Sequence, residues 1–84
     1  MVSIRVEETK DFTRSLQKVK SNSLKIQIKK QILKIIEKPE VGKPMRYERK
    51  GTREVYVGHF RLSYAYSAEE ELIIMLDLYH KDEQ

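Results

Sequence analysis

An arginine within an apolar strand pattern, together with the basic segment that precedes it, offers the clearest chemistry in this chain. Arg61 lies between Phe60 and Leu62, and the segment from Lys43 to Arg53 is rich in cations. Clustered cations bind phosphates and favour the additional negative charge of a pentavalent phosphorane. The residues of the segment that we predict to bind phosphates are Lys43, Arg46, Arg49, Lys50 and Arg53.

The residue types needed to cleave RNA without a metal are also present. In that reaction the ribose 2′-hydroxyl attacks the adjacent phosphorus, so the site needs a base, a cation for the phosphorane and an acid for the leaving 5′-oxygen. Glu48 is the candidate base and Arg61 the candidate stabiliser, while His80 or Lys81 could be the acid. Each residue also has a structural interpretation, because strand arginines and isolated carboxylates usually form ion pairs and terminal histidines are often solvated.

The sequence carries none of the usual signatures of cofactor or metal enzymes. It has no Gly-rich phosphate loop, no helical histidine pair and no Gly-x-Ser-x-Gly elbow. Cysteine is absent, so neither a disulfide framework nor a thiolate metal site is available. We therefore expect neither a cofactor nor a metal.

Length and charge define the broad class of the protein. The 84 residues suffice for a single domain, 1–84, with a compact two-layer core. The formal net charge of +4 suits a polyanionic partner. No apolar run approaches the length of a membrane span, and the amino terminus lacks the pattern of a signal peptide. We expect a soluble, cytoplasmic protein with no membrane partner.

Two helices are predicted between residues 9 and 38. Thr9 can cap a helix whose apolar residues Phe12, Leu16 and Val19 share one face. The sequence Ser21-Asn22-Ser23 then separates it from a second helix, which Pro39 must end near Lys38. The lysines of the second helix are those of an ordinary solvated face, namely Lys25, Lys29, Lys30 and Lys34.

The remaining segments have the alternation of strands. Val2, Ile4 and Val6 predict a first strand, and residues 45–49 predict an edge strand after the connector from Pro39 to Pro44. Residues 54–57 and 60–66 form a hairpin about Gly58-His59, and residues 72–79 are apolar enough for a central strand. Alternation in the fourth of these strands places Phe60, Leu62, Tyr64 and Tyr66 on one face and Arg61, Ser63 and Ala65 on the other.

The predicted fold class is α+β with the element order β-α-α-β-β-β-β. An N-terminal strand and a helical hairpin precede a four-stranded antiparallel meander, and the helices pack on one face of the sheet. Arg61 is then expected on the open face, away from the helices.

Several short motifs, in this order and spacing, resemble the RelE/ParE superfamily of toxins from bacterial and archaeal toxin–antitoxin systems. The resemblance spans nearly the whole chain, because the element order matches as well. The motifs that carry it are Gly42-Lys43-Pro44, the segment from Met45 to Gly51, Arg61-Leu62-Ser63-Tyr64 and Tyr79-His80-Lys81.

The resemblance implies a small toxin that enters the ribosomal A site and cleaves mRNA, and that a cognate acidic, RelB-like antitoxin holds inactive. In the YoeB-like branch the corresponding residues would make Glu48 the base and Arg61 the phosphate stabiliser, with His80 completing the site. RelE-like members instead use a pair of lysines in the strand where this chain has Glu54 and Tyr56. Many relatives also continue to a C-terminal tyrosine, which Tyr56 or Tyr79 could replace by stacking on RNA bases.

Two other functions remain open at this stage. The same scaffold hosts ParE-like inhibitors that bind DNA gyrase and have no nuclease activity. A degenerate toxin homologue without activity, or a simple RNA-binding module, is the third reading. Retention of Glu48 together with His80 favours the nuclease.

Overall fold

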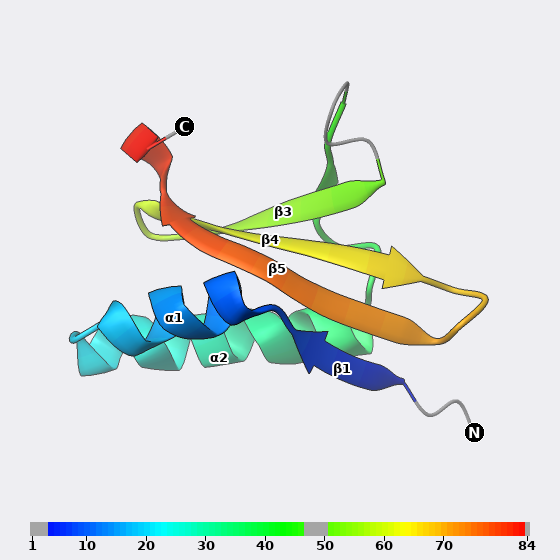
Figure 1. Ribbon diagram of the computed structural model, residues 1–84, viewed down its shortest axis with the longest axis horizontal. Coiled ribbons are helices and arrows are strands. Elements are labelled where there is room, and N and C mark those ends of the chain that lie inside the picture. The colour runs from blue at the N-terminus through cyan, green and yellow to red at the C-terminus, as the bar shows by residue number, and fades with distance from the viewer. Residues whose placement is uncertain (1–3, 47–50, 84) are drawn as a thin grey trace.

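The computed structural model describes residues 4–46 and 51–83, which form two layers (Figure 1). One layer is a sheet of five strands, and the other consists of two helices that lie side by side beneath one face of that sheet. The elements in chain order are β1 (Arg5–Glu8), α1 (Lys10–Lys18), α2 (Asn22–Glu37), β2 (Lys43–Pro44), β3 (Thr52–Val57), β4 (Phe60–Ser67), β5 (Leu72–His80) and the 3-10 turn η2 (Lys81–Glu83).

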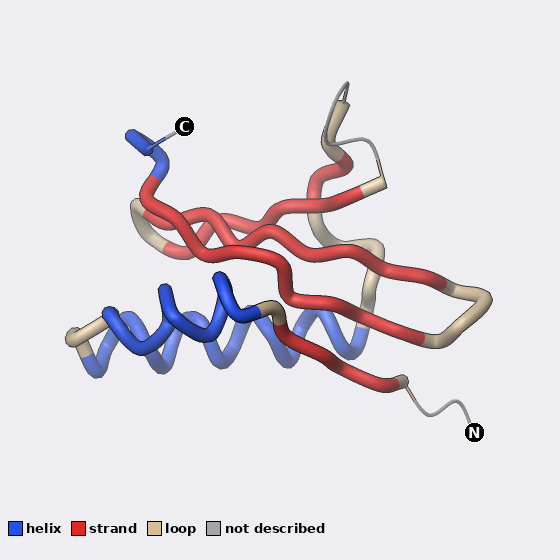
Figure 2. The backbone as a smooth tube through the Cα atoms, viewed as in Figure 1, coloured by secondary structure: helices blue, strands red, loops and turns tan. Residues whose placement is uncertain are grey.

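The strand order across the sheet is β1-β5-β4-β3-β2. Strands β2 to β5 form an antiparallel meander, and β1 joins its far edge parallel to β5. The α+β fold class and the order of elements are therefore as predicted. Figure 2 shows both helices on one face of the sheet, which leaves the other face without a helix to cover it.

Local sequence determines both helices. Thr9 caps α1 by accepting a hydrogen bond from the Phe12 amide at 3.1 Å, and Ser21 caps α2 through the Leu24 amide at the same distance. The helix α2 ends at Glu37, shortly before Pro39. Both predicted helices are confirmed.

The core lies between the helices and the inner face of the sheet. The fully buried side chains there come from both layers and are Phe12, Ile28, Ile35, Leu62, Tyr64, Ile73 and Met75. The alternation predicted for β4 is confirmed, since Leu62 and Tyr64 are in this core and Arg61 is on the opposite face. No helix among residues 4–46 and 51–83 is long and apolar enough to cross a membrane.

The first strand is shorter and less buried than its alternation predicts. It spans Arg5–Glu8, and Val2 lies outside the described residues. Ile4 packs against the core, but Val6 is 40% exposed because β1 is the outermost strand of the sheet. The alternation of Val2, Ile4 and Val6 is typical of a half-buried strand, and β1 is instead exposed along its length.

A buried tyrosine holds the connector between α2 and β2. The Tyr64 hydroxyl donates to the Pro39 carbonyl at 2.7 Å and accepts from the Gly42 amide at 2.9 Å. A Cβ atom on Gly42 would lie 2.6 Å from that hydroxyl, so the close approach requires glycine. The chain then enters β2 at Lys43, two residues earlier than predicted, and residues 47–49 of the predicted edge strand lie outside the described residues.

Candidate nucleic-acid interface on the open face

The register of the sheet brings three side chains into one row on the open face. Arg61 of β4 pairs with Tyr56 of β3 on one side and with Tyr79 of β5 on the other. Directly paired residues of antiparallel strands point to the same face. The row therefore joins the predicted phosphate stabiliser to both predicted base-stacking tyrosines, which are far apart in the sequence.

Arg61 lies between an acid and an aromatic ring. Its Nη1 atom lies 3.8 Å from Oε1 of Glu54, and its Cζ atom lies 5.1 Å from the centroid of the Tyr56 ring. The Glu54 side chain is 2% exposed, whereas that of Arg61 is 26% exposed. The other carboxylate oxygen of Glu54 accepts a hydrogen bond from the Tyr79 hydroxyl. The guanidinium is thus flanked by the carboxylate and the ring and still reaches solvent.

A hollow of about 250 Å³ opens beside this guanidinium. Arg61 and Lys81 supply its cations, and Tyr56 and His59 supply aromatic rings. The Lys81 amide donates to the His59 carbonyl at 2.9 Å, which ties the end of β5 to the β3–β4 turn. Two positive charges next to exposed aromatic rings are suited to a phosphate and an unstacked base.

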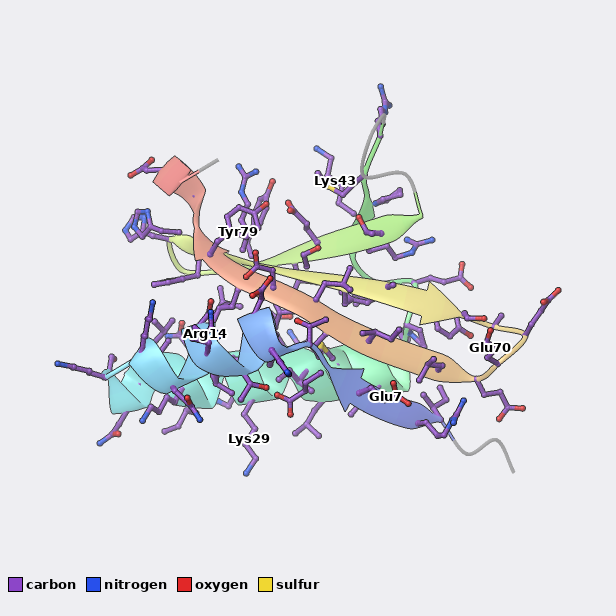
Figure 3. The ribbon with its side chains drawn as sticks, viewed as in Figure 1. Glu7, Arg14, Lys29, Lys43, Glu70 and Tyr79 are labelled. Carbon is purple, nitrogen blue, oxygen red and sulfur yellow. The ribbon has the colours of Figure 1, made fainter. Side chains whose placement is uncertain are left out.

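Two further hollows are linked to this one through shared lining residues. Tyr56 also borders a hollow of about 350 Å³ with Lys34 and Lys43, and Lys43 borders another of about 610 Å³ with Arg46. Lys43 lies on the open side of the sheet, whereas Lys29 extends from α2 away from it (Figure 3). We call the surface formed by Arg46, Lys43, Lys34, Tyr56, Arg61 and Lys81 the basic track. It includes Lys34 of α2, which the sequence assigned to an ordinary solvated helix face.

His80 does not line the hollow beside Arg61, although its ring stacks on that of His59, which does, with the two centroids 6.0 Å apart. Neighbouring residues of a strand point to opposite faces, and His80 follows Tyr79, so its side chain is on the inner face with its partner Phe60. The two rings meet edge to face with centroids 5.4 Å apart, and Nδ1 of His80 lies 3.5 Å from Oδ2 of Asp82. The histidine that lines the hollow is His59, which the sequence analysis did not select.

Arg53 has a different environment from the other predicted phosphate ligands. Its Nη1 atom donates to the carbonyls of Glu40 at 3.0 Å and Gly42 at 2.8 Å. It pairs in the sheet with Tyr64, whose side chain is in the core, so it lies on the face opposite Arg61. Arg53 therefore holds the α2–β2 connector. Glu48, Arg49 and Lys50 lie outside the described residues.

Comparison with known proteins places these features in a family context. Residues 6–84 match the sequence model of the ParE toxin of the type II toxin–antitoxin system parDE. No protein of curated function matches the sequence.

Solved structures resemble the fold over nearly its full length. A chain of the RelBE2 toxin–antitoxin complex of Mycobacterium tuberculosis is 28% identical, with a TM-score of 0.78 over 92% of this chain and 96% of that one. A chain of the archaeal RelE–RelB complex of Pyrococcus horikoshii is 18% identical, with a TM-score of 0.75 over 100% of both chains. The YoeB/ParE toxin of Agrobacterium tumefaciens is 12% identical, with a TM-score of 0.82 over 92% and 98%.

Proposed function

Since the chain belongs to the ParE toxin family of type II toxin–antitoxin systems, within the RelE/ParE superfamily, we propose that it is a ribosome-dependent mRNA endoribonuclease that inhibits translation. The observation that carries this proposal is the hollow beside Arg61, where two cations and two aromatic rings face solvent together. Such a site can bind the scissile phosphate and stack a neighbouring base.

The basic track supports an extended ligand rather than a small one. Its cations come from α2, β2, the segment after β2, β4 and η2. Tyr56 borders two of its three hollows, and Lys43 borders the third together with one of those two. A single-stranded RNA could place successive phosphates along such a surface and stack a base on Tyr56, which is 57% exposed. A small metabolite would need a closed pocket instead.

The reaction we propose needs no metal. A base removes the proton of the ribose 2′-hydroxyl, the 2′-oxygen forms a bond to phosphorus, and the bond to the 5′-oxygen breaks as an acid protonates that oxygen. Arg61 stabilises the charge on the phosphorane. The products are a 2′,3′-cyclic phosphate and a 5′-hydroxyl.

Proton transfer in this proposal falls to three residues. Glu48 is the base assigned from the resemblance. Lys81 and His59 are the candidate acids because both line the hollow with Arg61. Histidine is the side chain most often used as a general acid or base. A direct role for His80 is less favoured because its side chain is on the other face of the sheet.

We further propose that an acidic, RelB-like antitoxin inhibits the protein. The relatives from M. tuberculosis and P. horikoshii were solved as toxin–antitoxin complexes. An acidic segment that folds on binding could cover Arg61 or distort the basic track. Adding such an antitoxin should abolish cleavage and slow amine labelling of Lys81. Cleavage that persists in the saturated complex would contradict this mechanism.

Inhibition of DNA gyrase by direct binding is the second candidate function. The description of the matched family favours it, as does the position of His80, which leaves the acid of the YoeB-like mechanism on the wrong face. In that case Tyr56 and Arg61 would contact a protein rather than RNA.

Two assays with the purified protein separate these functions. The first incubates it with ribosomes programmed with a defined mRNA and maps new 5′ ends by primer extension. The second measures supercoiling by gyrase at the same protein concentrations. Ribosome-dependent cleavage with unaffected supercoiling supports the nuclease. Intact mRNA with inhibited supercoiling would replace it with the gyrase inhibitor, and no effect in either assay would indicate an inactive homologue.

A further inference from the structure

Glu54 is the one charged residue with a fully buried side chain among residues 4–46 and 51–83. It lies on β3, and only 3% of its surface is exposed although it belongs to the open face of the sheet. Burying a carboxylate costs on the order of several kcal/mol of hydration free energy. The group keeps its charge only if nearby donors and cations compensate for that cost. The burial of Glu54 on the open face therefore requires compensating partners.

Two of the compensating groups belong to the candidate site. One oxygen of Glu54 faces the Arg61 guanidinium at 3.8 Å, and the other accepts the hydrogen bond from the Tyr79 hydroxyl. The three residues come from three adjacent strands, which the register keeps in fixed relation. The Glu54 carboxylate thus accepts a hydrogen bond from Tyr79 through one oxygen and faces the Arg61 guanidinium with the other.

Stability alone does not account for this arrangement. Replacing a buried ion pair by apolar residues of similar volume is often neutral or stabilising. What an apolar residue could not do is restrain the guanidinium, since an arginine side chain has several rotatable bonds and loses rotamer entropy when it is held. With Glu54 on one side and the Tyr56 ring on another, Arg61 lines the hollow that Lys81 also lines.

We propose that Glu54 is a positioning residue that orients Arg61 toward the scissile phosphate, an inference that rests on the proposed nuclease function. Glu54 acts through Arg61, because its side chain is 2% exposed and offers little surface to a substrate. Holding the stabilising group in place before the reaction reduces the reorganisation needed in the transition state. The effect should therefore fall on kcat rather than on KM.

The test uses Glu54→Gln, which preserves the volume and the acceptor for Tyr79 but removes the charge. We expect kcat for cleavage on the ribosome to fall about 10-fold with KM within about 2-fold, as expected when a stabilising group loses its orientation. The same substitution in an Arg61→Ala background should have no further effect on kcat. Glu70→Gln is the matched control, because Glu70 is exposed in the β4–β5 turn and the change in net charge is the same.

A purely structural role predicts a different result. It would reduce activity by the same factor in the presence and absence of Arg61, and that outcome, like an unchanged kcat, would overturn the proposal. If Glu54→Gln fails to fold, Tyr79→Phe provides a second variant, because it removes the phenol donor to the carboxylate and should lower kcat in the same direction.

A measurement without substrate separates this inference from the proposed function. The order parameter of the Arg61 Nε–H group, obtained by ¹⁵N relaxation, should be high in the wild type and fall in Glu54→Gln, with Arg14 unchanged as an internal reference. An unchanged order parameter at Arg61 would overturn the positioning role even if the protein cleaves mRNA. Intact mRNA with wild-type protein would overturn the nuclease instead, and the order parameters would still decide whether Glu54 restrains Arg61.

Discussion

Arg61 on β4 lies directly opposite Tyr79 on β5, and the side chains of both interact with a single carboxylate, that of Glu54 on β3. Side chains from three strands thus meet at one buried acid next to a partly exposed guanidinium. The Tyr56 ring and the hollow next to Lys81 complete the surroundings of that guanidinium. The proposed chemistry depends on this arrangement.

The basic track predicts that Lys43 and Lys29 differ in how much they contribute to RNA binding. Lys43→Ala should weaken binding of a single-stranded RNA oligonucleotide and reduce the slope of log K against log salt by about 0.7, the value for one phosphate contact on a single strand. Lys29→Ala is the matched control, because Lys29 extends from α2 away from the sheet (Figure 3). Fluorescence anisotropy at several salt concentrations measures both. Equal losses for the two variants would show that binding is not confined to the track.

The two histidines should differ in their effect on cleavage. His59 lines the hollow with Arg61, whereas His80 packs edge to face on Phe60 on the inner face. We expect His59→Ala to lower the single-turnover rate by about 100-fold if it transfers a proton, and by less if it only stacks on a base. His80→Ala serves as the comparison. A greater loss for His80 would contradict the assignment and restore the mechanism inferred from the resemblance.

The sequence predicted the elements whose causes are local. Thr9 and Ser21 are the helix caps expected from residue type, and Leu62 and Tyr64 are on the buried face expected from alternation. The position of Arg53 on the inner face could also have been predicted, because it alternates in step with Val55 and Val57, which are in the core.

The burial of Glu54 could not be predicted in this way. Its partner Arg61 is reached across a hairpin and its partner Tyr79 is 25 residues away, so both contacts depend on the sheet register. The same register separates His80 from Arg61. No local pattern of residue types specifies which residues of adjacent strands lie opposite each other when a β-bulge interrupts the pairing, as it does between Ser63 and Tyr64.

The Tyr64 hydroxyl should contribute measurably to stability. Tyr64→Phe removes its hydrogen bonds and leaves the Gly42 amide and the Pro39 carbonyl without this partner. We expect the free energy of unfolding to fall by about 1–3 kcal/mol, as measured by urea denaturation near neutral pH. Tyr66→Phe is the control, because Tyr66 is only partly buried against the core. A loss for Tyr64→Phe no larger than the control would contradict the role of the connector contacts.

The same phenol predicts a pH dependence. Burial raises the pKa of Tyr64, and the Gly42 amide and Arg53 only oppose that shift. Because the folded state binds the phenolic proton more tightly than the unfolded state, its contribution is complete below the unfolded pKa of about 10 and is lost as the pH rises through the folded pKa. Between about pH 9 and 11, wild-type stability should therefore fall more steeply than that of Tyr64→Phe. Parallel curves for the two proteins would be inconsistent with a raised pKa.

The most direct test of the nuclease function is a single-turnover cleavage assay on programmed ribosomes, comparing wild type, Arg61→Ala and Arg14→Ala. Arg14 is exposed on α1, in the helical layer and far from Arg61 in the sequence. Replacing it by alanine changes the net charge by the same amount as Arg61→Ala. We predict that the wild type and Arg14→Ala cut the mRNA at the same positions, and that Arg61→Ala, verified as folded by urea denaturation, is slower by about 100-fold or more, as for other groups that stabilise transition-state charge. Cleavage by Arg61→Ala at the wild-type rate, or intact mRNA with the wild type, would contradict the account.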